Sequence, residues 1–379
     1  MKIAILTHPL KKNYGGILQA WALQQVLLGE GHSVEMLWRD YPQPVPTISK
    51  RVKRIMVDAA KSIIEHRVYI TPDENDYNLV FAENLAFVNK HIRRSPQFYT
   101  SHELEEYVSR EKFDAIVVGS DQVWRADYSP CLDDFFLGFA SHISLRRVAY
   151  AASFGLDEWR YTDAETSMAS RLIRQFDAVG VREKSGVGLC EKCLGVNAQL
   201  TLDPTMLLDA GKYMELLDAD SPTPESDSGL YCYILDENRE KAALIARIAD
   251  GMGLRPFSVM PKLRPSAWRL DKHLDAYGFR SPMQWLRGFS DARMVVTDSF
   301  HGMVFSIIFN KPFWVIGNAT RGLARFSSLL SQFGLERRLL TNNSVDSVNL
   351  SAPIDWSDVN RRIAALRLAS LKFLKEGLL

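Results

Sequence analysis

The sequence is poor in cysteine, which limits the covalent and metal-based chemistry that it can support. Four cysteines in 379 residues are too few for a disulfide framework. Cys190 and Cys193 form a C-x-x-C pair, but no second pair of cysteines or histidines completes a zinc site. The pair also follows a Gly-Val-Gly turn, whereas a thioredoxin-like motif follows a strand and opens a helix. We therefore expect reduced thiols and no metal site.

Long apolar runs and an excess of charge are missing as well. No stretch reaches the ~18 apolar residues of a membrane span, and the net charge of +1 creates no field that attracts nucleic acid. Met1 leads directly into a short apolar strand and not into a signal peptide. We therefore expect a cytoplasmic protein with no nucleic-acid partner.

What is present is the pattern of a globular α/β protein. The chain is 46% hydrophobic and 24% charged, a mix that supplies a full core, and its length favours two domains. Apolar strands alternate with amphipathic helices in two successive series, which is typical of Rossmann-like domains. We assign residues 1–208 to the first domain and residues 209–379 to the second.

Two segments stand outside this alternation. Residues 40–110 form an excursion with helices predicted over 50–67, 78–92 and 101–110. The basic start of the first helix, residues 50–54, could contact the inner membrane surface, although a solvated helix face is the simpler explanation. The tail over 355–377 is a predicted amphipathic helix whose apolar side carries Val359, Ile363, Leu366, Ala369 and Phe373. It is expected to pack on the first domain or on another chain, which leaves the oligomeric state open.

Residues 293–317 contain the strand–helix–strand unit around which the second domain is organised. Two apolar runs flank the segment DSFHG and a short helical stretch. Asp298 or Ser299 can cap the helix, which places His301 in its first turn. That end of a helix attracts anions, and a histidine there can both contact an anion and transfer a proton. A role in packing or capping alone is the alternative.

A glycine-containing loop follows the first strand, residues 2–6. Asn13, Gly15 and Gly16 stand at the start of a helical segment, where glycine lets the backbone approach an anionic ligand closely. The loop lacks the G-x-G-x-x-G pattern and a clear ribose-binding acid, so a dinucleotide site is only weakly indicated. A turn that merely needs glycine is the alternative.

The strand over 113–118 ends in small and polar residues. Ser120, Asp121 and Gln122 crowd its carboxyl end, the edge at which doubly wound sheets bind their ligands. We therefore expect these side chains to contact a ligand.

The strand over 176–181 ends at Arg182. Arginine binds carboxylate and phosphate well because its planar fork can donate two hydrogen bonds at once. A plain ion pair with Glu183 on the surface is the alternative.

Together these motifs resemble the polysaccharide pyruvyl transferase family. The likeness runs from residue 2 to about residue 340 and is carried, in order, by NYGGILQAWALQ, FDAIVVGSDQVWR, AYAASFG, VRE, LDPTMLL and VVTDSFHGMVFSIIFNKPF. The resemblance implies a two-domain GT-B-like fold, phosphoenolpyruvate as the donor substrate and no bound cofactor. It also implies a glycan or lipid-linked oligosaccharide as the acceptor, which receives pyruvate as a ketal.

The resemblance also implies roles for individual residues. Arg182 would clamp the carboxylate or phosphate of the donor, and His301 would act as acid/base and anion contact. Asp121 is a candidate to accept a proton from the sugar hydroxyl. The remaining candidates are Ser299 and Gly302 for the donor, and Asn13, Gly15, Gly16, Ser120, Gln122 and Asp298 for the acceptor or an anion.

At one position the sequence departs from the family pattern. Some members carry an arginine two residues before the histidine, where this chain has Ser299. We expect Arg325, which follows the last strand of the unit, to supply the missing cation.

Two other functions stay open at this point. The GT-B fold also hosts glycosyltransferases that use a nucleotide sugar. A non-catalytic glycan-binding subunit would agree with the basic residues 50–54. Either enzymatic reading places the site between the two domains, which predicts closure around the substrates.

Overall fold

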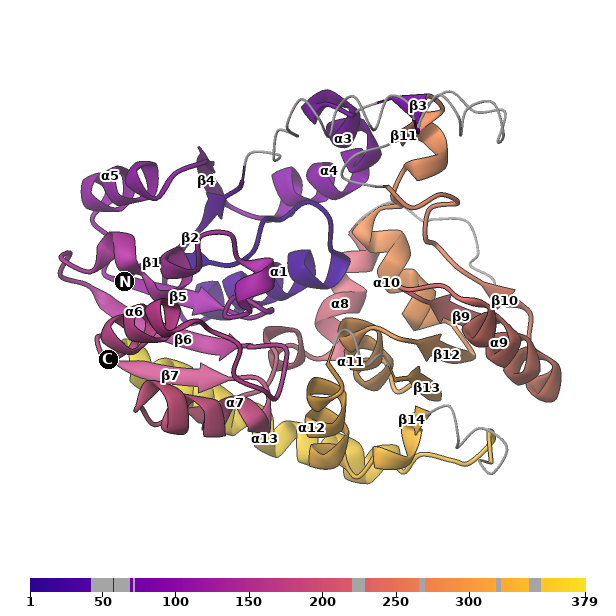
Figure 1. Cartoon of the computed structure of the whole chain (residues 1–379). Helices are drawn as coiled ribbons and strands as arrows, with labels where there is room; N and C mark the ends of the chain where they lie inside the picture. Colours follow the sequence, from indigo (N-terminus) through magenta and orange to yellow (C-terminus); the bar gives the residue numbers. More distant parts are fainter. Residues whose placement is uncertain are drawn as a thin grey trace.

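The computed structural model describes residues 1–41, 57, 69–70, 72–219, 229–265, 270–317, 322–340 and 349–379. Figure 1 shows two halves side by side, each built on a sheet that is flanked by helices. The basic run over 50–54 and nearly all of the helix predicted over 50–67 lie outside the described residues. Within the described ranges, no helix is both long enough and apolar enough to cross a membrane.

The first half contains a parallel seven-stranded sheet in the order β4-β2-β1-β5-β6-β7-β8. This is the doubly wound order 3-2-1-4-5-6 of nucleotide-binding folds, extended by one strand. The central strands are buried along their length, as a sheet covered on both faces requires. The strands are β1 (Lys2–Leu6), β2 (Ser33–Arg39), β4 (Arg94–Phe98), β5 (Ala115–Gly119), β6 (Arg146–Ala152), β7 (Ala178–Val181) and β8 (Gln199–Leu200).

The second half contains a parallel five-stranded sheet in the order β10-β9-β12-β13-β14. Within this sheet the chain order is 2-1-3-4-5, the other common doubly wound arrangement. Two Rossmann-like halves confirm the predicted α/β, GT-B-like fold class. The strands are β9 (Leu230–Tyr233), β10 (Pro256–Phe257), β12 (Met294–Thr297), β13 (Phe313–Ile316) and β14 (Leu339–Leu340).

Helices cover both sheets (Figure 1). In the first half they are α1 (Tyr14–Gly29), α3 (Glu74–Val80), α4 (Ala82–His91), α5 (Ser101–Glu111), α6 (Asp163–Ile173) and α7 (Lys184–Leu189). The later ones are α8 (Ala210–Asp218), α9 (Arg239–Met252), α10 (Pro282–Asp291), α11 (Phe300–Ile308), α12 (Ala324–Phe333) and α13 (Trp356–Leu378). The predicted strand–helix–strand unit is confirmed as β12, α11 and β13.

Two local predictions in the excursion are corrected. The single helix predicted over 78–92 is two helices, α3 and α4, that meet at Phe81. Phe81 leaves the helical conformation at this junction, and its ring packs on Phe279 of the second half, with ring centroids 4.9 Å apart. The sequence pattern also missed β4, whose Pro96 is tolerated because an edge strand loses little when one N–H is absent.

The chain crosses between the halves more than once. A short antiparallel pair joins β3 (Tyr69–Ile70) of the excursion to β11 (Leu270–Asp271) of the second half. The final helix, α13, returns to the first half, where Ser370 Oγ accepts a hydrogen bond from the Leu202 N–H at 3.0 Å. Packing of the tail helix on the first domain is therefore confirmed. The boundary predicted at residue 208 stays a prediction, since each half is completed by residues from the other.

The prediction of which residues form the apolar side of α13 is correct except at one position. Val359, Ile363 and Phe373 are buried, but Ala369 is exposed, and the neighbouring Ser370 faces the first half instead. Ser370 takes this place because its hydroxyl satisfies a backbone N–H in the crowded strip where the helix meets β6 and β7.

Candidate active site

His301 lies in the first turn of α11, at the junction of the two halves. Ser299 begins this helix: its Oγ accepts a hydrogen bond from the Gly302 N–H at 3.4 Å. The imidazole rests directly on Gly15 in the first turn of α1, because a Cβ added to Gly15 would lie 2.1 Å from His301 Nδ1. Gly15 is therefore required by the contact with His301, and not only by the turn.

The start of α1 is held against the second half by an aromatic contact. The ring of Tyr14 stacks on Trp285 of α10, with centroids 5.4 Å apart, and its hydroxyl donates to the Arg280 carbonyl at 2.7 Å. Asn13 caps α1 by accepting a hydrogen bond from the Gly15 N–H at 3.1 Å. The first turn of α1 thus contacts both α10 and the first turn of α11 across the junction of the halves.

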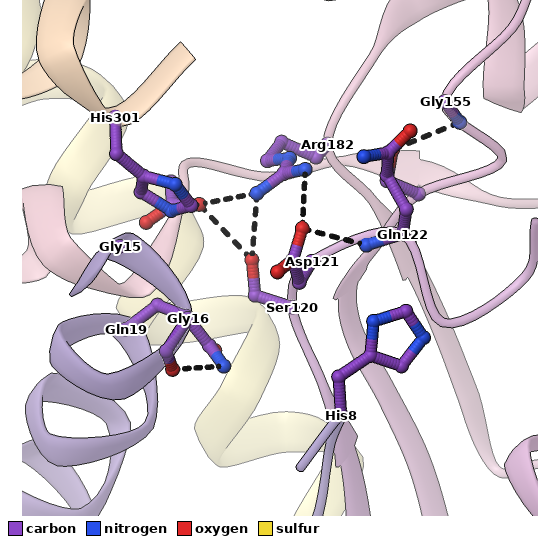
Figure 2. A network of polar contacts seen from close by, with 12 residues as sticks. His8, Gly15, Gly16, Gln19, Ser120, Asp121, Gln122, Gly155, Arg182 and His301 are labelled. Carbon is purple, nitrogen blue, oxygen red and sulfur yellow. Dashed lines mark hydrogen bonds and ion pairs between the residues drawn. The ribbon is translucent and has the colours of Figure 1, made fainter. Parts of the chain in front are cut away.

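Arg182 follows β7 and is buried beside two carboxylates. Its Nη1 lies 2.8 Å from Asp203 Oδ2, and its Nη2 lies 3.7 Å from Asp121 Oδ1 (Figure 2). Ser120 joins the cluster, since its Oγ donates to Asp203 at 3.0 Å. Among the described residues, nothing accepts a hydrogen bond from Nε or Nη2 of Arg182. The alternative of a surface pair with Glu183 is therefore wrong, because both side chains are buried.

Asp203 is the central member of the cluster, and the sequence interpretation did not single it out. Besides Arg182 and Ser120, it accepts two hydrogen bonds from Thr205, and its Oδ2 lies 3.5 Å from His301 Nε2. Burial alone would raise the pKa of this carboxyl, but the charges of His301 and Arg182 hold it well below its usual range. Asp203 is therefore an anion that joins the arginine of one half to the histidine of the other.

Asp121 stands at the carboxyl end of β5 in a left-handed backbone conformation, with φ of 68°. Such a conformation is uncommon for a residue with a side chain and is typical of functional sites. Asn13 donates to its Oδ2 at 3.2 Å. Burial favours the neutral acid, but the neighbouring cations, Arg182 foremost, outweigh it and lower the pKa of Asp121. Asp121 is thus a buried carboxylate, and a carboxylate can accept a proton.

Arg325 of α12 reaches the same region from the second half. It is 6% exposed, and its guanidinium lies 5.7 Å from the centroid of the Phe300 ring, which Arg182 also contacts at 4.3 Å. Burial and the charge of Arg182 lower the pKa of Arg325, while Glu183 and Asp121 act in the opposite direction. Arg325 therefore lies near Arg182, in the region for which the sequence predicts a second cation.

Glu183 organises the backbone next to these arginines. Its Oε1 accepts hydrogen bonds from the N–H groups of Phe154 and Gly155, at 2.8 and 3.3 Å. Burial raises the pKa of this carboxyl, against the opposing effect of Arg182 and Arg325. Its role is to fix the loop after β6, and through it the surroundings of Gln122.

A cleft of about 860 Å³ opens beside Asp121 at the carboxyl ends of β1, β2 and β5. Tyrosines, carboxylates and two lysines line it, a combination that suits the mixed apolar faces and hydroxyls of a sugar. The lining residues are His8, Pro9, Lys11, Lys12, Asn13, Gly16, Asp40, Tyr41, Pro72, Asp73, Glu74, Tyr77, Tyr99, Asp121, Tyr128 and Pro130. Asn13, Gly16 and Asp121 therefore belong both to this cleft and to the region around Arg182.

Other predicted residues occupy supporting positions. Gln122 lies in the same loop, where its Oε1 accepts from Arg125 at 3.1 Å. Gly302 is needed for packing, since a Cβ there would lie 2.2 Å from Thr297 Oγ1. These contacts position the cluster, and the ligand-binding roles assigned to the two residues stay predictions.

Asp298 is not part of the cluster. Its carboxylate accepts hydrogen bonds from the N–H groups of Leu235 and Asp236 and forms a 2.6 Å ion pair with Lys241. These contacts tie the loop after β9 to the end of β12. The structure therefore gives Asp298 a structural position, and its contacts do not support the predicted role in binding the acceptor or an anion.

The two parallel sheets, joined at an arginine–carboxylate–histidine cluster and bound together by the last helix, define a GT-B-like α/β protein. The family model for polysaccharide pyruvyl transferase matches residues 13–320. The chain belongs to this family, whose members are transferases of polysaccharide biosynthesis. No match was found among curated proteins.

Solved structures with a similar course of the chain are enzymes of sugar metabolism. The UDP-GlcNAc 2-epimerase of Methanocaldococcus jannaschii is 11% identical, with a TM-score of 0.49 over 96% of this chain and 99% of its own. The UDP-N-acetylglucosamine 2-epimerase of Rickettsia bellii is 10% identical, with a TM-score of 0.48 over 99% and 96%. At these identities and scores, the fold is established by the strand orders above, and the activities belong to those proteins.

Proposed function

We propose that the protein transfers pyruvate from phosphoenolpyruvate to two hydroxyls of one sugar in a glycan or lipid-linked glycan, forming a pyruvate ketal. The observation that carries this proposal is Arg182, a buried arginine with two nitrogens that have no hydrogen-bond acceptor among the described residues. It stands beside His301 and Asp121 at the junction of the halves. A buried cation of this kind suits a small anion that carries both carboxylate and phosphate.

The reaction requires proton transfers on both sides of the site. C3 of phosphoenolpyruvate takes up a proton, C2 gains two bonds to sugar oxygens, and the bond between C2 and the phosphate oxygen breaks. Of the two hydroxyl protons, one is balanced by the new methyl group and the other leaves with phosphate. In this scheme His301 serves as the acid toward the donor and Asp121 as a base toward the acceptor, and such positioned groups typically contribute about 10²–10⁴-fold in rate.

The arrangement of cations agrees with this division of roles. Arg182 of the first half and Arg325 of the second approach the same Phe300 ring, so the donor would be gripped from both halves. The cleft beside Asp121 would hold the acceptor sugar. Because Arg182 and His301 are 2% and 5% exposed, donor entry requires the halves to separate, and closure would then exclude water.

Thermal unfolding with and without phosphoenolpyruvate tests the donor, with a panel of nucleotide sugars measured beside it. A ligand that binds only the folded protein at ~100 times its dissociation constant adds about 2.7 kcal/mol of stability. We expect stabilisation by phosphoenolpyruvate that is lost in Arg182→Ala and in Arg325→Met, and retained in Arg146→Met, which changes an exposed arginine of the first half. Arg325→Met is an independent test of the donor site. It is included because Arg182→Ala also removes the ion-pair partner of the buried Asp203 and thereby lowers the stability of the protein itself. Stabilisation by a nucleotide sugar alone, or by no ligand, contradicts the proposal.

A further inference from the structure

His8 lies on the acceptor side of the site and is not used by the scheme above. It follows β1, while Asp121 follows β5, and these strands are neighbours in the sheet with Leu6 paired to Val118. Both side chains therefore emerge from the same edge, and both line the cleft of about 860 Å³. Figure 2 shows Asp121 between Arg182 and His8, with one nitrogen of the His8 ring turned toward the Asp121–Gln122 turn. His8 also precedes residues 13–320, the part matched by the family model.

A hydrogen-bond chain determines which nitrogen of His8 carries the proton. The Ser129 hydroxyl donates to the Val123 carbonyl at 2.9 Å, so its single hydrogen is already committed. The contact of 3.1 Å between His8 Nε2 and Ser129 Oγ must then have Nε2–H as its donor. This arrangement leaves Nδ1 as an unprotonated nitrogen in the neutral imidazole. An edge-on contact with Phe135, at 5.3 Å between centroids, also holds the ring.

Burial of His8 in the protein favours this neutral form. Burial lowers the pKa of His8, Asp121 opposes this effect, and Arg182 adds to it. A neutral imidazole with Nδ1 free is a base, and it stands in the cleft next to a second base, Asp121. Two bases at this edge correspond to the two hydroxyls that must each lose a proton when a ketal forms.

We propose that His8 Nδ1 accepts the proton of the second sugar hydroxyl, an inference that rests on the proposed function. In the first addition, C3 of phosphoenolpyruvate gains a proton, and one hydroxyl oxygen bonds to C2 as Asp121 takes its proton. In the second, the other hydroxyl oxygen bonds to C2 as His8 takes its proton. The bond from C2 to the phosphate oxygen breaks with its electron pair on phosphate. Of the two protons held by Asp121 and His8, one restores the acid that protonated C3, and the other leaves with phosphate. Asp121, the nearer of the two to Arg182, acts first.

This order predicts that removing the second base traps the product of the first addition. His8→Gln keeps a donor near the position of Nε2 for Ser129 but has no base at the position of Nδ1. The probes are phosphoenolpyruvate with p-nitrophenyl hexopyranosides that have free 4- and 6-hydroxyls, followed by rapid quenching and mass spectrometry. We expect His8→Gln to form ketal about 100-fold more slowly or worse, and to accumulate sugar that carries the whole mass of phosphoenolpyruvate. Asp121→Asn should form neither species, and His102→Gln, on the exposed face of α5, should match the wild type.

The outcomes separate the inference from the function on which it rests. Ketal formation by His8→Gln at the wild-type rate overturns the inference, and so does a loss of ketal with no adduct in a variant that still binds phosphoenolpyruvate. A wild-type protein that converts none of the probes counts against the proposed function. In that case nitrogen-15 spectra of histidine-labelled protein still show which ring nitrogen of His8 carries the proton. We expect the Nε2–H tautomer at neutral pH, disturbed by Ser129→Ala, and an Nδ1–H or doubly protonated ring overturns the inference.

Discussion

Replacing Asp203 with asparagine should lower the free energy of unfolding by about 3–5 kcal/mol, the cost of leaving a buried charge without its partner. Asparagine keeps the shape of the side chain, and its Oδ1 can still accept the two hydrogen bonds from Thr205. It cannot replace the charge that lies 2.8 Å from Arg182 Nη1 and 3.5 Å from His301 Nε2. Of its two ion pairs with the carboxylates of the cluster, Arg182 would then keep the longer one, with Asp121 at 3.7 Å from Nη2, beside a neutral hydrogen bond to Ser120 Oγ at 3.3 Å.

Urea unfolding followed by tryptophan fluorescence and far-ultraviolet circular dichroism measures this loss. The matched control is Glu111→Gln, because Glu111 forms an equally short 2.8 Å pair with Lys2 but both side chains are about one-third exposed, at 31% and 33%. A surface pair of this kind contributes only about 0–1 kcal/mol. If Asp203→Asn costs no more than Glu111→Gln, Asp203 does not hold the site together and the reasoning is refuted.

Two further measurements sharpen the test. The double variant Arg182→Met/Asp203→Asn should lose less stability than the sum of the single variants, because neither charge is then left alone. The pH dependence has a defined sign as well. The folded pKa of Asp203 lies below the unfolded value, so its contribution is complete above about pH 4 and is lost as the pH falls further. The difference between wild type and Asp203→Asn should thus be constant near neutrality and shrink in acid.

Three other outcomes follow from single contacts. Gly15→Ala should displace His301, lower the free energy of unfolding by about 1–3 kcal/mol and reduce turnover. The control Gly29→Ala, with no atom within 4 Å of the new Cβ, should leave stability unchanged. Equal melting temperatures of the two variants would contradict the contact between Gly15 and His301. Lys241→Met should cost about 3–5 kcal/mol because it strands the buried Asp298; unchanged stability with weakened substrate binding would return Asp298 to the ligand site. His8 has a folded pKa below its unfolded value, so its contribution to stability is lost as the pH falls from about 6.5; this slope should be absent from urea titrations of His8→Gln.

Much of the fold is predictable because its causes are local. The apolar runs, the capping serine before His301 and the glycines before α1 act over a few residues, and the structure places them as expected. Arg182, Asp121 and His301 were also predictable, since each stands just beyond the end of a strand. Arg182 and Asp121 meet because they follow parallel strands of one sheet, whose carboxyl ends share an edge. His301 follows a strand of the second sheet and joins them across the junction of the halves.

Pairings between distant segments could not be predicted in the same way. Asp203 was visible only as part of LDPTMLL, and nothing in its neighbourhood announces that Arg182 and His301 converge on it. Asp298 is a different case: its position before the helix suggests a ligand contact, while its carboxylate is paired with Lys241 from another helix. In both cases the deciding partner lies far along the chain, and only the folded topology brings the two side chains together.

The return of α13 to the first sheet has a consequence for folding during synthesis. Phe373 and Gly377 pack on β6 and β7, where a Cβ on Gly377 would lie 2.8 Å from the Ala178 side chain and one on Gly180 would lie 2.7 Å from the Phe373 ring. Most domains of a nascent chain can fold in the order in which they leave the ribosome. Here the part of the amino-terminal sheet formed by β6 and β7 lacks the cover of α13 until residues 356–378 have been translated. A ribosome stalled before residue 356 would therefore hold a chain with an exposed apolar surface that chaperones can recognise.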